Sequence, residues 1–322
     1  MKQKLFAVVC LSLIASWTQT LQAQGSLPEY RKAAGVSGKV TSIGSDTLNN
    51  LMTEWSELFR KYYPSVKTEI QGLGSSTAPP ALIQGTSNFG PMSRAMKRKE
   101  IEAFEAAYGY PPTAVPVAID LLAVFANIDN PIEGLSIDQV DGIFSSTYRC
   151  GGDRVTRWRD VGLQDRAWRK KRVRTYGRNS VSGTYSYFKK VALCKGDFSK
   201  SVSEQSGSSA VVQAVANDLY GIGYSGIGYQ TSRVRVVPLA PANSSDFVTP
   251  TAATAINGDY PLSRLLYIYV NKAPGQPLKP LEKEFVRMIL SRQGQEIVAK
   301  TGYIPLPFVI IDEHRKQLNV LD

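Results

Sequence analysis

The feature that most constrains this chain is an alternation of strand-like and helix-like segments that continues over most of its length. Short apolar runs are typical of buried strands, and they alternate with stretches whose apolar residues recur at every third or fourth position. In the first half we expect strands at 38–43, 66–71, 88–92 and 113–127, and helices at 48–63, 79–84 and 97–108. This order predicts an α/β fold with a mainly parallel sheet.

The second half continues the same alternation. We expect strands at 172–176 and 265–270, and helices at 137–144, 185–193, 208–219 and from 280 onward. The chain has 322 residues, enough for roughly two domains, and neither a fixed-period repeat nor a low-complexity linker separates its halves. We therefore expect two α/β lobes with a ligand cleft between them.

The first 23 residues have the order of a cleavable secretory signal peptide. Lys2 and Lys4 precede the apolar run 5–15, and a polar stretch then leads to Ala23. The run is too short to span a bilayer, although an N-terminal membrane anchor is the alternative. Export is therefore expected, and cleavage would remove two lysines and no acids, lowering the formal net charge from +11 to +9.

Export changes how the three cysteines are interpreted. Cys10 leaves with the signal peptide, so Cys150 and Cys194 remain as an even pair. In an oxidising compartment such a pair most simply forms a disulfide, with two buried free thiols as the alternative.

The single histidine, His314, argues against several classes of enzyme and metal protein. It lies in a polar C-terminal tail, so a Ser-His-Asp triad is not expected, and a histidine-rich metal site is impossible. A secreted phosphatase would need a metal cluster or an activated nucleophile, and the sequence offers neither. We expect no enzyme activity and no cofactor.

Two further motifs favour simple interpretations. Basic residues are concentrated at Arg166, Arg169, Lys170, Lys171, Arg172, Arg174 and Arg178. In an exported protein such a run indicates a solvated basic surface, and we expect no nucleic-acid partner. The glycines of 221–226 have the spacing of a dinucleotide fingerprint, but 227–237 has the pattern of loop and strand where that fingerprint requires a helix.

Three short loops rich in Gly, Ser and Thr each lie between an expected strand and an expected helix, at 44–47, 74–77 and 182–184. Unpaired N–H groups and the helix dipole attract an anion to a helix start, and the hydroxyl groups add donors. Arg178, four residues before Ser182, would add a charged, bidentate contact. Plain helix capping by Ser and Thr is the alternative for each loop.

These loops carry a resemblance to a known family. The string Arg178-x-x-x-Ser182-Gly183-Thr184 is similar to the signature of the periplasmic phosphate-binding proteins of Pst-type ABC importers. The same order of motifs continues over roughly residues 37–310, and includes 44–48, 72–76, the segment from Phe89-Gly90 to Ser93-Arg94, and 221–224.

The resemblance implies a type II periplasmic binding protein fold that binds inorganic phosphate with high affinity and delivers it to an inner-membrane ABC permease. We expect a periplasmic monomer, with one lobe at 24–125 and 260–322 and the other at 126–259. Binding of another tetrahedral oxyanion such as sulfate or molybdate is one alternative function. A secreted surface or adhesion protein that retains the fold is another.

Carried over position by position, the resemblance assigns phosphate contacts to both lobes. Thr47 would contribute its hydroxyl, Leu48 its backbone N–H and Ser75 its hydroxyl. The contacts implied from the other lobe are those of Arg178, Ser182, Gly183 and Thr184. The remaining candidates, within or near these loops or in the strand 113–127, are Ser45, Asp46, Ser93, Arg94 and Asp120.

One departure from the family concerns selectivity. In the best-known members an aspartate, at or beside the position of Ser93, accepts the proton of hydrogen phosphate, which sulfate lacks at neutral pH. Asp120 is our first candidate to replace it, because an acid inside an apolar stretch is costly without a partner. Asp46 is the second, with N-capping of helix 48–63 as its alternative, and Arg94 is a candidate for a compensating cation.

Overall fold

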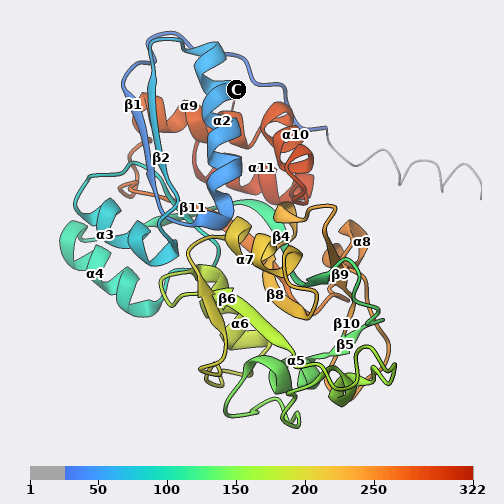
Figure 1. Ribbon diagram of the computed structural model, residues 1–322. Helices are drawn as coiled ribbons and strands as arrows, with labels where there is room; N and C mark the ends of the chain where they lie inside the picture. The colour runs from blue at the N-terminus through green and yellow to red at the C-terminus, as the bar shows by residue number, and fades with distance from the viewer. Residues whose placement is uncertain (1–25, 322) are drawn as a thin grey trace, which may run out of the picture.

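The computed structural model describes residues 26–321 as two α/β lobes joined by a central mixed sheet (Figure 1). The expected signal peptide, with Cys10, lies outside the described residues. Within 26–321, no helix is long and apolar enough to cross a bilayer.

The first lobe combines the two ends of the described chain. Its N-terminal elements are β1 (Lys39–Ile43), α2 (Asn49–Tyr62), β2 (Lys67–Gln71), α3 (Ala78–Ile83), β3 (Gly90–Met92) and α4 (Arg98–Tyr108). Its C-terminal elements are α9 (Pro280–Ile289), α10 (Arg292–Lys300) and α11 (Phe308–Gln317). The red C-terminal helices α9, α10 and α11 pack beside the blue α2 in Figure 1. Two single-turn 3-10 helices, η1 (Asp46–Leu48) and η2 (Ser75–Thr77), precede α2 and α3.

The second lobe is formed by the middle of the chain. Its strands are β5 (Leu135–Ser136), β6 (Arg174–Arg178), β7 (Ser203–Gln205), β8 (Gly221–Gly226), β9 (Val234–Val237) and β10 (Leu239–Ala240). Its helices are α5 (Ile137–Phe144), η3 (Trp158–Val161), α6 (Gly183–Val191), α7 (Ser208–Ala216), η4 (Ile227–Tyr229) and α8 (Ala252–Ile256). The expected Cys150–Cys194 disulfide is present in this lobe, which excludes free thiols.

Two strands connect the lobes. β4 (Thr113–Asn127) pairs along its first part with β11 (Ser263–Val270) and along its last part with β8 and β9. Its apolar sequence is explained by burial, since almost every residue from Val115 onward is inaccessible to solvent. The long strand thereby contributes to a core in each lobe.

The expectation of a mainly parallel sheet was wrong. In the central sheet, with the order β3-β11-β4-β8-β6-β7, only the β6–β8 and β6–β7 pairs are parallel, whereas β4 is antiparallel to β11, β8 and β9. Apolar runs indicate that strands exist, but their direction depends on how the connecting segments cross. Here β4 leaves the first lobe and β11 returns to it, so the two must run in opposite directions.

Each lobe has its own aromatic core. Trp55, Phe59 and Phe285 are fully buried in the first, and Trp158 and Phe188 in the second. The residues 221–226, whose spacing resembled a dinucleotide fingerprint, form strand β8 followed by the short turn η4, so the helix that such a site needs does not follow.

Candidate functional site

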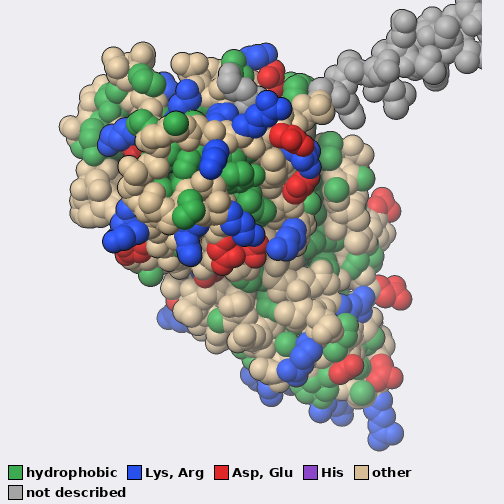
Figure 2. Space-filling view, turned by 90° about the horizontal axis from the view of Figure 1, so that it is seen from above, with side chains coloured by type: hydrophobic (Ala, Val, Ile, Leu, Met, Phe, Trp, Pro, Cys, Tyr) green, Lys and Arg blue, Asp and Glu red, His purple; other side chains and the backbone are tan. Residues whose placement is uncertain are grey.

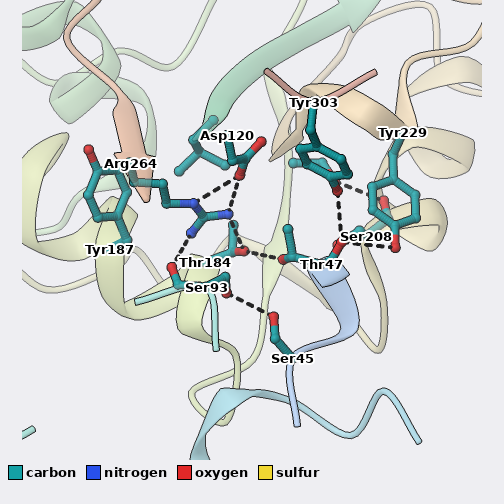
Figure 3. Close-up of polar contacts among 12 residues, drawn as sticks. Ser45, Thr47, Ser93, Asp120, Thr184, Tyr187, Ser208, Tyr229, Arg264 and Tyr303 are labelled. Carbon is teal, nitrogen blue, oxygen red and sulfur yellow. Dashed lines mark hydrogen bonds and ion pairs between the residues drawn. The ribbon is translucent and has the colours of Figure 1, made fainter. Parts of the chain in front are cut away.

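The three Gly, Ser and Thr loops that the sequence singled out meet at one place between the lobes. Thr47 Oγ1 of η1 lies 2.9 Å from Thr184 Oγ1 of α6 (Figure 3). The Ser76 N–H of η2 donates to the Val181 carbonyl at 3.1 Å. Both contacts join residues of different lobes. The loops, far apart in sequence, therefore form a single polar site.

The hydroxyl groups of this site are buried and bond to one another. Ser45 Oγ donates to Ser93 Oγ at 3.0 Å, and Ser93 Oγ lies 3.2 Å from Ser75 Oγ. The residues Ser45, Thr47, Ser75, Ser93, Ser182 and Thr184 are all at most 2% exposed. Hydroxyl groups can rotate between partners, so this cluster can redirect its hydrogens towards a bound oxyanion.

Only one of the three loops contains a side chain that caps the helix after it. Ser182 Oγ accepts the Thr184 N–H at 3.1 Å, as an ordinary N-cap does, and its own hydrogen is left for another acceptor. Ser45 makes no side-chain cap at η1, and the N-cap position of η2 is Gly74, which has no side chain. The Leu48 N–H, expected to face the ligand, donates to the Ser45 carbonyl at 3.2 Å.

Gly183 lies where no side chain fits. A Cβ built on it would overlap Ser75 Oγ and Ser93 Oγ of the opposite lobe. The glycine therefore lets the start of α6 approach the hydroxyl cluster closely enough for its N–H groups to face an anion there.

Arg178, at the end of β6, is 2% exposed and joins the two lobes through Asp46. Its guanidinium donates to Asp46 Oδ2 at 3.0 Å and to Ser208 Oγ at 2.7 Å, whereas its Nε is buried without a hydrogen-bond partner. Burial lowers the pKa of Arg178, and the Asp46 carboxylate opposes that shift.

Asp46 bonds the second lobe through one carboxylate oxygen and does not cap α2. Its Oδ2 also accepts the Ser208 N–H at 2.7 Å, at the start of α7, so its carboxylate caps a helix of the opposite lobe. It does not cap α2, because the chain first makes the turn η1 and α2 begins only at Asn49. An oxygen occupied by Arg178 and by a helix start is poorly placed to accept a ligand proton.

Asp120 lies in β4 directly opposite Arg264 of β11, a residue that the sequence analysis missed. The Arg264 guanidinium donates to Asp120 Oδ2 through Nε at 2.9 Å and through Nη2 at 2.7 Å, and also to Thr184 Oγ1 at 2.9 Å (Figure 3). Asp120 is fully buried, and its Oδ1 has no partner. An arginine within the apolar run 263–270 was the available signal, because a buried cation there requires an acidic neighbour.

Arg94 does not act as a cation of this site. Both of its terminal nitrogens bond the Glu100 carboxylate at 2.7 Å, and Nη2 also donates to Ser76 Oγ at 3.2 Å. Its charge is therefore neutralised within the first lobe, at the start of α4. The guanidinium that does bond Ser93 is that of Arg264, whose Nη1 donates to the Ser93 carbonyl at 3.0 Å.

Two tyrosines donate hydrogen bonds to backbone carbonyls of the loop 44–47. Tyr229 of η4 donates its hydroxyl hydrogen to the Asp46 carbonyl at 2.7 Å, and Tyr303 donates to the Thr47 carbonyl at 2.7 Å. Burial raises the pKa of the Tyr303 hydroxyl well above its usual value, so it remains a donor. No local pattern marked either residue, since only the packing of η4 and the C-terminal segment brings them to η1.

Buried donors supplied by two lobes define a binding protein for a small anion, and the comparisons with known proteins name the family. Residues 31–293 match the family described as the PBP superfamily domain. The phosphate-binding protein PstS of Pseudomonas aeruginosa is 57% identical over 296 residues, which are 92% of this chain and 91% of the relative. The chain therefore belongs to the PBP superfamily and, within it, to the family of PstS phosphate-binding proteins.

Solved structures share the fold. A putative phosphate ABC transporter substrate-binding protein with bound phosphate, from Clostridium perfringens, has a TM-score of 0.69 at 24% identity, covering 83% of this chain and 99% of that one. A possible phosphate binding protein from Planctomyces limnophilus has a TM-score of 0.63 at 26% identity, covering 89% and 100%.

Proposed function

We propose that this chain binds inorganic phosphate between its lobes in the periplasm and delivers it to an inner-membrane ABC permease. One observation carries the assignment of ligand. Where the lobes meet, Arg178 Nε is a buried donor and Asp120 Oδ1 is a buried acceptor, and neither has a hydrogen-bond partner. Hydrogen phosphate has both an anionic oxygen for the donor and a proton for the acceptor, and buried polar groups are rarely left unsatisfied.

The remaining donors surround the same place. Thr47, Ser75, Ser182 and Thr184 would turn their hydroxyl hydrogens towards the phosphate oxygens, in exchange for the bonds that some of them now make with one another. The N-terminus of α6 at Gly183 would add backbone N–H groups and its dipole. Ser45 and Ser93 complete this cluster, since Ser45 Oγ donates to Ser93 Oγ and the Ser93 N–H donates to Ser75 Oγ.

Asp120 gives the site its selectivity in this proposal. An ionised carboxylate can only accept hydrogen bonds, so its Oδ1 favours a ligand that carries a proton. Sulfate would place an unprotonated oxygen against that oxygen in a buried, low-dielectric setting, where repulsion is strong. Arg264 neutralises the other carboxylate oxygen and orients the side chain.

We assign one lobe to 24–125 and 260–322 and the other to 126–259, and we propose that the lobes close on the ligand about β4 and β11. The separate aromatic cores support this division. We also propose that the chain is a monomer without enzyme activity. Residues 1–23 would direct its export and then be cleaved off. The support is the name of the 57% identical relative and the order of the leader sequence.

Isothermal titration of the mature protein with phosphate, sulfate and molybdate tests the proposal. We expect tight binding of phosphate alone, with one site per chain. Tight binding of sulfate without phosphate would overturn the assignment. Turnover of a chromogenic phosphate ester above a metal-free blank would overturn the statement that the chain is not an enzyme.

A further inference from the structure

The segment 154–174, which carries most of the basic run noted in the sequence, lies at the end of the second lobe in Figure 1. Residues 154–174, here called the basic hairpin, pair their two ends in antiparallel fashion. The Val173 N–H donates to the Thr156 carbonyl and the Trp158 N–H to the Lys171 carbonyl, both at 3.1 Å. The basic run noted in the sequence is therefore part of a folded element and not of a loose loop.

Aromatic packing fixes the base of the basic hairpin. Trp158 is fully buried and meets Trp168 edge to face at 6.0 Å between ring centroids, and Trp168 meets Tyr220 at 5.3 Å. The Lys171 ammonium lies 5.2 Å from the centre of the Tyr220 ring. The backbone that carries these charges is therefore fixed before any partner arrives, which lowers the entropic cost of binding.

Several of these charges have no partner within residues 26–321. The side chains of Arg154, Arg166, Arg169, Lys170 and Arg172 are exposed and make neither an ion pair nor a side-chain hydrogen bond there. The acids Asp160 and Asp165 accept backbone N–H groups within the basic hairpin. In Figure 2, basic and acidic side chains are interspersed over the upper part of the view.

Two of the free arginines line a small hollow. Its volume is about 130 Å³, and Arg154 and Arg172 share its lining with Thr175, Ser199 and Ser201. Ser199 Oγ and Ser201 Oγ lie 2.8 Å apart, so one of the two hydrogens is free to point elsewhere. Guanidinium and hydroxyl groups that line one hollow are donors of the kind that recognise phosphoryl groups.

We propose that this hollow is a second anion site, separate from the one between the lobes, and that it takes a phosphoryl group of an inorganic polyphosphate chain. The unpaired cations of the basic hairpin would contact the following units of the chain. A concave site lined with hydroxyl groups favours an extended polyanion that can enter it over a flat anionic membrane. The proposal does not depend on which ligand the inter-lobe site binds.

Titration of the mature protein with polyphosphate, in excess phosphate that keeps the inter-lobe site filled, tests this site. Arg154→Gln combined with Arg172→Gln removes both arginines of the hollow. Arg60→Gln combined with Lys61→Gln, at exposed positions of α2, is the matched control with the same change in net charge. We expect the first pair to weaken polyphosphate binding by about tenfold or more and the control pair to have little effect.

Further measurements check that the variants fold and compare polyphosphate with other polyanions. Phosphate affinity between the lobes should be the same in all three proteins, which would show that both variants fold. Equal weakening by the two pairs would overturn the proposal, because net charge alone would then explain binding. Binding of anionic lipid vesicles or duplex DNA as tight as that of polyphosphate, with the same dependence on Arg154 and Arg172, would also overturn it.

Discussion

Asp120 and Arg264 face each other across the antiparallel pair β4 and β11, and the guanidinium holds one carboxylate oxygen at 2.7 and 2.9 Å. The other oxygen is buried without a partner. The two carboxylate oxygens of Asp120 therefore have different roles. One oxygen neutralises a cation that also reaches Thr184 in the opposite lobe, and the other remains for a ligand.

Asp120→Asn should reduce the preference for phosphate over sulfate. The amide keeps the size of the side chain but can offer a donor to the ligand, so the advantage of a protonated oxygen is lost. A hydrogen bond to a charged group contributes about 1.5–3 kcal/mol, so the ratio of the two dissociation constants should change by about tenfold or more. Titration with both anions measures it, and an unchanged ratio would remove Asp120 from the selectivity role.

Arg178→Ala should weaken phosphate binding by about 100-fold while the chain stays folded. The substitution removes the buried Nε donor and leaves Asp46 without its cation. Titration gives the affinity, and circular dichroism verifies the fold. Arg60→Ala, at an exposed position of α2, is the control and should bind as the parent does. Parent-like affinity in Arg178→Ala would exclude Arg178 from the site.

Gly183→Ala should prevent the lobes from approaching fully. The added methyl group would occupy the space of Ser75 Oγ and Ser93 Oγ, which belong to the opposite lobe. We expect a large loss of phosphate affinity with a small change in the free energy of unfolding, because the overlap exists only when the lobes are together. Gly109→Ala, at a helix end with open space around it, is a control with the opposite pattern, since its φ of 81° makes any strain local.

Replacement of Cys150 and Cys194 by serine should lower the free energy of unfolding by about 3–4 kcal/mol in the chain-entropy model. The bridge joins residues 44 apart in sequence, within the second lobe and outside the inter-lobe site. Denaturation by urea should show the loss, whereas phosphate affinity should be nearly unchanged. An equal effect of a reducing agent on the parent would confirm that the bridge is the cause.

The ion pair between Glu100 and Arg94 should make stability depend on pH in the acid range. Burial alone would raise the pKa of Glu100, but hydrogen bonds from Arg94 and from the Lys97 N–H outweigh it and lower this pKa. The stabilisation is therefore complete above the unfolded pKa of about 4.3 and is lost as the pH falls towards the folded value. Glu100→Gln should be less stable than the parent at pH 7, and the difference in free energy of unfolding should shrink at acidic pH.

Local sequence patterns were sufficient for much of the fold and part of the site. The recurrence of apolar residues located α2 and α4, a continuous apolar run located β4, and the Gly, Ser and Thr loops located the helix starts at η1, η2 and α6. These features depend on neighbouring residues, such as a run of apolar side chains or a small residue before a helix. The pairing of Cys150 with Cys194 followed from elimination once an exported chain was assumed.

The partners across the site depended on the tertiary structure. Arg264 opposes Asp120 only because β11 returns antiparallel to β4, and strand direction is not encoded in the period of either strand. Asp46 bonds Arg178 and the start of α7 instead of capping α2, because the two lobes meet there. The sequence by itself determined which residue types were available to bind an anion. Only the packing of the two lobes decided which charges neutralise each other and which buried atoms are left for a ligand.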